Sequence, residues 1–203
     1  MKKRQDIQAP MDEKVVLLHT CCAPCSSAII EALMNNGITP VIYYCNPNIY
    51  PQQEYEIRKN ECTRYAQSLG LEIVDADYDH EEWLESVKGL ENEPERGGRC
   101  LKCFKLRLLR TARYARCRGI RVITTTLASS RWKSLDQINE AGEWAVAAVR
   151  QEENTIPPAD SQVIWWDQNW RKNGLQERRL QIIKEYDFYN QLYCGCEFSM
   201  RKD

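Results

Sequence analysis

The chain has 203 residues, of which 43% are hydrophobic, and a formal net charge of −1 at pH 7. This length allows a sizeable core, and we expect a flexible N-terminal tail over residues 1–13 followed by a single α/β domain over residues 14–203. No apolar run reaches the roughly 18 to 20 residues that span a bilayer, and no apolar segment of a signal peptide follows the basic start, so a cytoplasmic protein is expected.

The small net charge hides a separation of charge along the chain. Residues 72–95 contain ten acidic residues and one lysine, whereas residues 96–135 contain twelve lysines and arginines and no acidic residue. A basic stretch of this length is typical of a phosphate-binding face, and a solvated helix side is the alternative. The near-neutral total argues against a protein that coats nucleic acid without selectivity.

The first predicted strand spans residues 14–19, and a helix is predicted over residues 24–36. The turn between them, His19 to Cys25, contains Cys21, Cys22 and Cys25 and no glycine. In many open α/β proteins this turn is glycine-rich and binds phosphate. Here it offers sulfur, and the helix N-terminus would stabilise thiolates. The turn therefore predicts a metal or redox site at the carboxyl end of the first strand.

A second strand is predicted over residues 38–44, which completes a parallel strand–helix–strand unit. It runs into a loop rich in proline and asparagine that contains Asn46 and Asn48. Because the carboxyl ends of parallel strands meet at one edge of the sheet, we expect these asparagines to line the same cleft as the cysteines. A polar helix over 52–69, a strand over 71–76 and an acidic helix over 79–87 are predicted next.

Cys100 and Cys103 open the following helix in a Cys-x-x-Cys pattern, which lets both sulfurs approach one metal or cluster. Apolar residues recur along that helix every three or four positions, and Arg110 and Arg113 lie on its basic remainder. The later predicted elements are a strand over 121–126, a loop with Arg131 and Lys133, a helix over 134–150, a strand over 162–166 and a helix over 176–187. The alternation of strands and helices predicts an α/β fold.

The chain has ten cysteines, and without a signal peptide they favour metal binding or redox chemistry over a disulfide scaffold. Cys21 and Cys22 together with Cys100 and Cys103 supply four thiolates, the ligand set of a cubane iron–sulfur cluster or of a tetrahedral zinc site. Adjacent cysteines are awkward ligands for a small zinc site and suit a larger cluster better. Iron–sulfur is therefore the preferred interpretation, with zinc as the alternative.

Cys194 and Cys196 are separated by a single glycine. Such a pair can cycle between a dithiol and a disulfide, which handles two electrons, or it can bind a second metal with Cys25 as the third sulfur. The remaining cysteines are expected to be small core residues or idle thiols: Cys45, Cys62 and Cys117.

Five segments carry motifs in a recognisable order: His19 to Pro24, Asn46 to Pro51 with Glu54 and Tyr55 after it, Arg99 to Cys103, Thr124 to Leu127, and Tyr193 to Ser199. Together they resemble the cobalamin-independent epoxyqueuosine reductases of the QueH family, over roughly residues 14 to 200. The resemblance implies a Rossmann-like, nucleotide-hydrolase-like fold of three layers, with a mainly parallel sheet and a cysteine-rich metal site at the strand carboxyl ends. Residues 14–203 would then form a single catalytic domain.

The activity that the resemblance implies is that of a cytoplasmic oxidoreductase in tRNA processing. It would reduce epoxyqueuosine to queuosine at the wobble position, the last step of queuosine biosynthesis, in a two-electron reaction that releases water. By match of motif, a 4Fe-4S cluster would be held by Cys21, Cys22, Cys100 and Cys103. Cys194 and Cys196 would be the catalytic, redox-active pair, or ligands with Cys25 to an adjacent mononuclear iron.

The expected partners are the anticodon loop of tRNA and an external electron donor, with neither a membrane nor cobalamin. The proposed substrate-binding residues are Asn46, Asn48, Arg110, Arg113, Arg131 and Lys133. Candidates for the general acid are His19, His80, Asp77 and Tyr193. Three positions depart from the family pattern: Cys25 stands where some members have aspartate, Arg131 replaces a proline, and Asn190 replaces an arginine.

Two other functions are compatible with parts of the sequence. A tRNA-thiolating enzyme would share the fold and the RNA, but it would need a glycine-rich phosphate loop after the first strand, which the turn from His19 to Cys25 does not resemble. A zinc- or iron–sulfur-stabilised RNA-binding module without catalysis is the non-enzymatic alternative.

Overall fold

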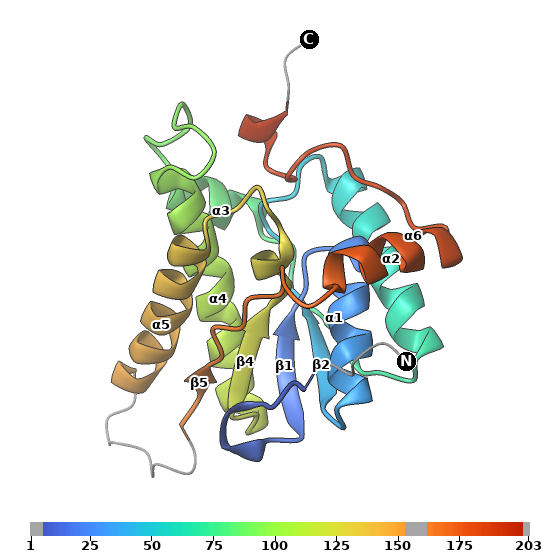
Figure 1. Cartoon of the computed structure of the whole chain (residues 1–203). Coiled ribbons are helices and arrows are strands. Elements are labelled where there is room, and N and C mark those ends of the chain that lie inside the picture. Colours follow the sequence, from blue (N-terminus) through green and yellow to red (C-terminus); the bar gives the residue numbers. More distant parts are fainter. Residues whose placement is uncertain (1–5, 153–161, 201–203) are drawn as a thin grey trace.

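The computed structural model describes residues 6–152 and 162–200. Its five strands are all parallel and form one sheet in the order β3-β2-β1-β4-β5 (Figure 1). The strands are β1 Val15–His19, β2 Thr39–Tyr44, β3 Ile73–Asp75, β4 Val122–Thr125 and β5 Ile164–Trp165. The helices are α1 Ala23–Asn35, α2 Gln52–Ser68, α3 His80–Ser86, α4 Gly98–Arg118, α5 Leu135–Gln151 and α6 Leu175–Glu185, with short 3-10 turns η1 Pro10–Asp12, η2 Thr126–Ser129 and η4 Glu197–Ser199.

Helices cover both faces of the sheet, and the predicted α/β fold is confirmed. Helices α1, α2 and α6 lie on one side of the central strands, and α4 and α5 lie on the other (Figure 1). Val16 to Leu18 in β1 are fully buried because a parallel strand in this position has a packed layer against each face. The element boundaries agree closely with the predicted ones. Two strands are shorter than predicted: β3 contains only residues 73–75 of the predicted 71–76, and in β5 only Ile164 and Trp165 pair with β4.

Helix α4 is the longest element and shows the predicted apolar face. Leu108, Ala112 and Ala115, spaced by four and three residues, have no exposed surface. The helix ends at Gly119, whose φ of 66° is the left-handed conformation that glycine adopts without strain. This long helix carries Cys100 and Cys103 in its first two turns and packs against the neighbouring helix α5 (Figure 1).

The segment before β1 contributes to the core in its described part. Ile7 and Ala9 are buried, and the backbone N–H of Ile7 donates to Asn36 Oδ1 at 3.2 Å. Residues 1–5 of the expected tail lie outside the described residues. Across the described ranges, none of the helices combines the length and apolar character that crossing a membrane requires.

The order of the strands fixes where a ligand can bind. The chain builds β1, β2 and β3 outward in one direction and then returns to place β4 on the other side of β1. In open α/β sheets, the crevice at such a reversal, beyond the strand carboxyl ends, is the usual binding site. Here Cys21 to Cys25 follow β1, and η2 follows β4. The cysteine turn therefore lies at the switch point of the sheet.

A close approach between α5 and β5 gives a stability prediction. A β-carbon on Gly142 would lie 2.2 Å from ring atoms of Trp165, so Gly142→Ala must displace the indole. On an open helix the same change would stabilise by about 1 kcal/mol. Here we expect destabilisation by about 1 to 3 kcal/mol, measured by urea unfolding.

The control is Ala147→Gly on the exposed side of the same helix, which should cost only about 1 kcal/mol through helix propensity. A Gly142→Ala protein as stable as the parent, or more stable, would show that the packing between α5 and β5 is looser than described.

Candidate functional site

Three cysteines meet at the N-terminus of α1. The sulfurs of Cys21, Cys22 and Cys25 all lie within 4.8 Å of one another. In the part of the chain that the structure describes, they are the one group of three or more histidine, cysteine or acidic residues this close. The backbone N–H of Cys21 donates to Thr126 Oγ1 at 3.2 Å, which ties the turn after β1 to η2 after β4. This hydrogen bond therefore holds the cysteine turn against the segment that follows β4.

The three thiols do not share their protons equally. Hydrogen bonds from Cys22 and Cys25 hold the pKa of Cys21 well below its ordinary value. Burial raises the pKa of Cys22. The hydrogen bond between Cys25 and Cys21 raises the pKa of Cys25 to about 12. One sulfur of the group thus favours the thiolate form, which is the form that binds a metal. A soft-metal or iron–sulfur centre suits this donor set.

Arg107 places a positive charge beside the cysteines. It is buried on α4, where Nε donates to the carbonyl of Cys45 at 3.2 Å and Nη2 donates to Asn46 Oδ1. Its Nη1 lies 3.9 Å from the sulfur of Cys103. Although burial lowers the pKa of Arg107, the sulfurs of Cys103 and Cys21 raise it overall. Arg107 is not among the predicted site residues, although its spacing of four from Cys103 puts both on one helix face.

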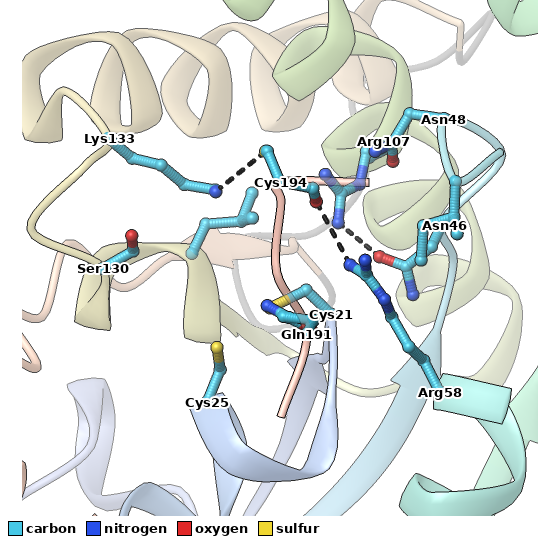
Figure 2. A pocket seen from close by; sticks show the side chains of 12 residues that line it. Cys21, Cys25, Asn46, Asn48, Arg58, Arg107, Ser130, Lys133, Gln191 and Cys194 are labelled. Atoms are coloured by element: carbon cyan, nitrogen blue, oxygen red, sulfur yellow. Dashed lines mark hydrogen bonds between the residues drawn. The ribbon is translucent and has the colours of Figure 1, made fainter. Parts of the chain in front are cut away.

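A cavity lies between the cysteine turn and the C-terminal segment, residues 189–200 (Figure 2). Cys194 lies on its wall, and its sulfur accepts a hydrogen bond from Lys133 Nζ at 3.2 Å. The charges of Cys194 and Cys21 raise the pKa of Lys133 against the effect of burial. The other lining residues are Cys21, Cys25, Asn46, Asn48, Ile49, Arg58, Arg107, Leu127, Ser130 and Gln191. Of the predicted substrate-binding residues, Asn46, Asn48 and Lys133 therefore meet here.

Arg58 fastens the C-terminal segment over this edge of the sheet. Its Nη1 donates to the carbonyl of Cys194 at 3.2 Å, and its Nη2 donates to that of Tyr193 at 3.3 Å (Figure 2). Glu54, four residues earlier on α2, accepts from Arg58 Nε at 2.7 Å. Gly195 completes the hold, because its carbonyl accepts from Tyr50 N at 2.9 Å and its φ of 120° suits glycine. The i, i+4 spacing of Glu54 and Arg58 predicts the ion pair between them but not the contacts with Tyr193 and Cys194.

Cys100 and Cys103 lie in the first two turns of α4, outside the group of Cys21, Cys22 and Cys25. The half-buried sulfur of Cys100 accepts from the backbone N–H of Arg96 at 3.3 Å. Cys103 packs with Cys196 in a small second core that also contains Trp83. Within the described residues, neither Cys100 nor Cys103 belongs to a group of three ligands with sulfurs as close as those after β1.

The two asparagines after β2 have different tasks. Asn46 is occupied, since its Nδ2 donates to the carbonyl of Thr20 at 2.9 Å and its oxygen accepts from Arg107. Asn48 is buried, and its Oδ1 has no hydrogen-bond partner among the described residues. Gln191 also lies on the cavity wall, and its Oε1 likewise has no hydrogen-bond partner among the described residues. A buried acceptor without a donor is costly, so both oxygens point to a ligand that donates hydrogen bonds.

The remaining predicted phosphate contacts lie outside the cavity. Arg110 forms ion pairs with Asp79, at 3.6 Å, and with Glu82. Arg113 pairs with Glu152, whose Oε1 lies 2.9 Å from its Nε. Arg131 is exposed on the loop after η2. The positive charges of Arg110 and Arg113 are therefore largely offset within the protein.

The histidines have structural contacts. His19 is fully buried, with Nδ1 2.7 Å from Thr125 Oγ1 and Nε2 3.0 Å from the carbonyl of Cys45. Burial lowers the pKa of His19 to about 3, so the ring is neutral at physiological pH and is a poor general acid. His80 links the loop after β2 to the C-terminal segment. Its Nδ1 lies 2.7 Å from the carbonyl of Pro47, and its Nε2 lies 3.1 Å from Glu197 Oε1.

Comparison with known proteins gives consistent matches over almost the whole chain. The family model "Epoxyqueuosine reductase QueH" matches residues 16–202. The epoxyqueuosine reductase QueH of Haemophilus influenzae is 44% identical over 198 residues, which cover 98% of this chain and 76% of that protein. The protein of the same name from Acinetobacter baylyi is 43% identical over 200 residues (98% and 87%), and that from Thermotoga maritima is 33% identical over 188 residues (91% and 90%).

The hold of Arg58 on the C-terminal segment can be tested directly. Arg58→Lys keeps the charge beside Glu54 but cannot donate to both carbonyls of Tyr193 and Cys194. Loss of hydrogen bonds from a charged donor costs roughly 1 to 3 kcal/mol, so amide hydrogen exchange over residues 189–200 should accelerate on the order of tenfold.

The matched control is Arg64→Lys on the same helix, which loses an exposed contact to the carbonyl of Tyr186. Unchanged exchange over residues 189–200 in Arg58→Lys would mean that other contacts hold the segment.

Proposed function

This chain belongs to the epoxyqueuosine reductase QueH family, and we propose that the cysteine-lined cavity at the switch point of its sheet is where its reaction takes place. The chain is an oxidoreductase that converts epoxyqueuosine to queuosine in tRNA. Two electrons and two protons enter, both carbon–oxygen bonds of the epoxide break, a carbon–carbon double bond forms, and the oxygen leaves as water. The thiolating enzyme and the non-catalytic RNA-binding module are set aside, because the family is one of reductases.

One observation carries the choice of site. Cys21, Cys25 and Cys194 come from opposite ends of the sequence and yet line the same cavity. Lys133 and Arg107 bring positive charge to it, and Asn48 offers a free acceptor. Reductive opening of an epoxide needs electrons close to the ring and a group that stabilises the departing oxygen. This cavity combines sulfur, cations and an unoccupied polar atom.

We propose that the site holds a 4Fe-4S cluster on Cys21, Cys22, Cys100 and Cys103. The donor set supports this, because two of these ligands, Cys21 and Cys22, already have their sulfurs within 4.8 Å of each other and soft thiolates are the ligands of such clusters. When bound, the cluster would supply electrons singly. The chain's own contribution is to keep the thiolates ionised. The N-terminus of α1, Arg107 and Lys133 all favour negative charge at the sulfurs.

Cys194 and Cys196 have two proposed roles. As a dithiol, they would provide the two electrons and two protons of the reaction and end as a disulfide, which the external electron donor would reduce again. As ligands, they would hold a mononuclear iron together with Cys25. Cys194 suits either role because it shares the cavity with Cys25, whereas Cys196 is buried beside Cys103.

The substrate enters as part of a tRNA anticodon loop, whose splayed wobble base would be read at its edges. Asn48 and Gln191 offer hydrogen-bond acceptors to it, and Asn46 holds Arg107 in place. Lys133 and Arg131 would contact phosphate, as would Arg110 and Arg113 after exchanging their carboxylate partners. The electrons come from an external donor in the cytoplasm.

The function is tested in cells that make queuosine but lack any epoxyqueuosine reductase. Expression of this chain should convert the epoxyqueuosine of their tRNA to queuosine, measured by mass spectrometry of tRNA nucleosides. Cys194→Ser should leave epoxyqueuosine in place, whereas the exposed Cys117→Ser should behave as the parent. Persistent epoxyqueuosine with the unaltered chain would refute the function, and full activity of Cys194→Ser would refute the assigned site.

The cluster ligands are tested by metal content. After anaerobic purification, the parent should contain iron and acid-labile sulfide in about equal amounts, with visible absorbance. Cys21→Ser and Cys100→Ser should each lose most of both, and Cys117→Ser should lose none. Undiminished iron and sulfide in Cys100→Ser would exclude Cys100 as a ligand, and zinc without sulfide in the parent would exclude the cluster.

A further inference from the structure

Two large apolar side chains stand in solvent beside the cavity. Trp132 is 77% exposed and Leu192 is 93% exposed. Trp132 directly precedes Lys133, and Leu192 lies two residues before Cys194. Because Lys133 Nζ and Cys194 Sγ are 3.2 Å apart, the two segments meet at the cavity wall (Figure 2). Both apolar side chains are therefore within two residues of the contact between these segments.

The backbone that carries Trp132 is held in place, although its indole is not. Arg96 donates from Nη2 to the carbonyl of Arg131 at 2.9 Å and from Nε to the carbonyl of Trp132 at 3.0 Å. Arg171 donates to the carbonyl of Lys133 at 2.7 Å. The loop that presents the indole is therefore ordered at its backbone. A loop that is already ordered loses little backbone entropy on binding.

Other tryptophans of the chain show the contrast. Trp83 and Trp170 are fully buried. Trp144 is 41% exposed, but the ammonium of Lys105 lies over its ring at 5.6 Å from the centroid. In the described part of the chain, the ring of Trp132 stacks on no other aromatic ring. An isolated exposed apolar residue needs no explanation, but an exposed and unstacked indole on an ordered loop next to the cavity-lining Lys133 does.

The charges around Trp132 indicate what covers it. Arg96, Arg131, Lys133 and Arg171 surround its backbone, and within the described residues none of them forms an ion pair with a carboxylate. Burial, and after it the charge of Arg96, lowers the pKa of Arg171. Cations without a carboxylate partner beside a free aromatic ring are the combination that binds single-stranded nucleic acid, through phosphate contacts and base stacking.

We propose that Trp132 is a stacking platform for an unpaired base of the tRNA anticodon loop, and that Leu192 packs against the same loop from the other segment. This proposal rests on the proposed function. Arg96 and Arg171 are positioning residues, because they fix the loop that presents the indole. The platform holds the RNA so that the wobble nucleoside reaches the cavity beside Cys194.

The test uses the complete protein and tRNA purified from cells without epoxyqueuosine reductase. Trp132→Ala should raise the Kd for this tRNA on the order of tenfold, measured by filter binding, because a base stacked on an aromatic ring contributes about that factor. Trp132→Phe should retain most of the affinity, and Trp144→Ala should match the parent. The slope of log Kd against log salt should stay unchanged in Trp132→Ala and fall by about one in Arg131→Ala.

Kinetics with dithionite as the reductant separate this proposal from its rivals. Trp132→Ala should raise KM for tRNA on the order of tenfold at nearly unchanged kcat. If the parent reduces tRNA-bound epoxyqueuosine but Trp132→Ala keeps the parental Kd and KM, the platform is refuted and the function stands. A defect seen only with a protein electron donor, and absent with dithionite, would identify this surface as a protein-docking face and refute the proposal. A parent that binds tRNA without reducing it would refute the function alone.

Discussion

The site depends on a positive charge buried without a carboxylate. Arg107 lies between α4 and the end of β2, and its partners among the described residues are the carbonyl of Cys45, the amide oxygen of Asn46 and the thiol of Cys103. A buried cation is costly unless negative charge lies close by. The neighbouring sulfurs are the groups that can supply that charge, by ionising. Arg107 thus makes this edge of the sheet favourable for an anionic sulfur centre.

The fold determines where the site lies, and the residues of the turn after β1 determine which ligand it can bind. A reversal of strand order opens a crevice between β1 and β4, which in other α/β proteins holds the phosphates of a nucleotide. Here the turn has three cysteines and no glycine. The helix dipole that would stabilise phosphate stabilises thiolate in its place. The architecture is therefore that of other open α/β sheets, while the three cysteines of the turn could bind a metal.

Most of the framework was predictable, because it depends on local patterns. Apolar strands, helix periodicity and the clustered cysteines all act over a few residues. The roles of Arg58 and Arg107 were not predictable, since each becomes clear only when α2 or α4 is packed against another segment. The pairing of charged side chains was not predictable either. The acidic and basic stretches are separate in sequence, but Arg110 on α4 meets Asp79 beside α3. Some of the basic residues that were expected to bind phosphate are thus engaged in ion pairs within the protein.

The C-terminal segment is held by its main chain. Arg58 binds the carbonyls of Tyr193 and Cys194, and Tyr50 binds that of Gly195. Rotation about the Cα–Cβ bond of Cys194 breaks none of these three contacts. The sulfur can therefore turn from Lys133 toward another partner while the backbone stays where it is. A thiol mounted in this way can alternate between bonded states during a catalytic cycle without any rearrangement of the fold around it.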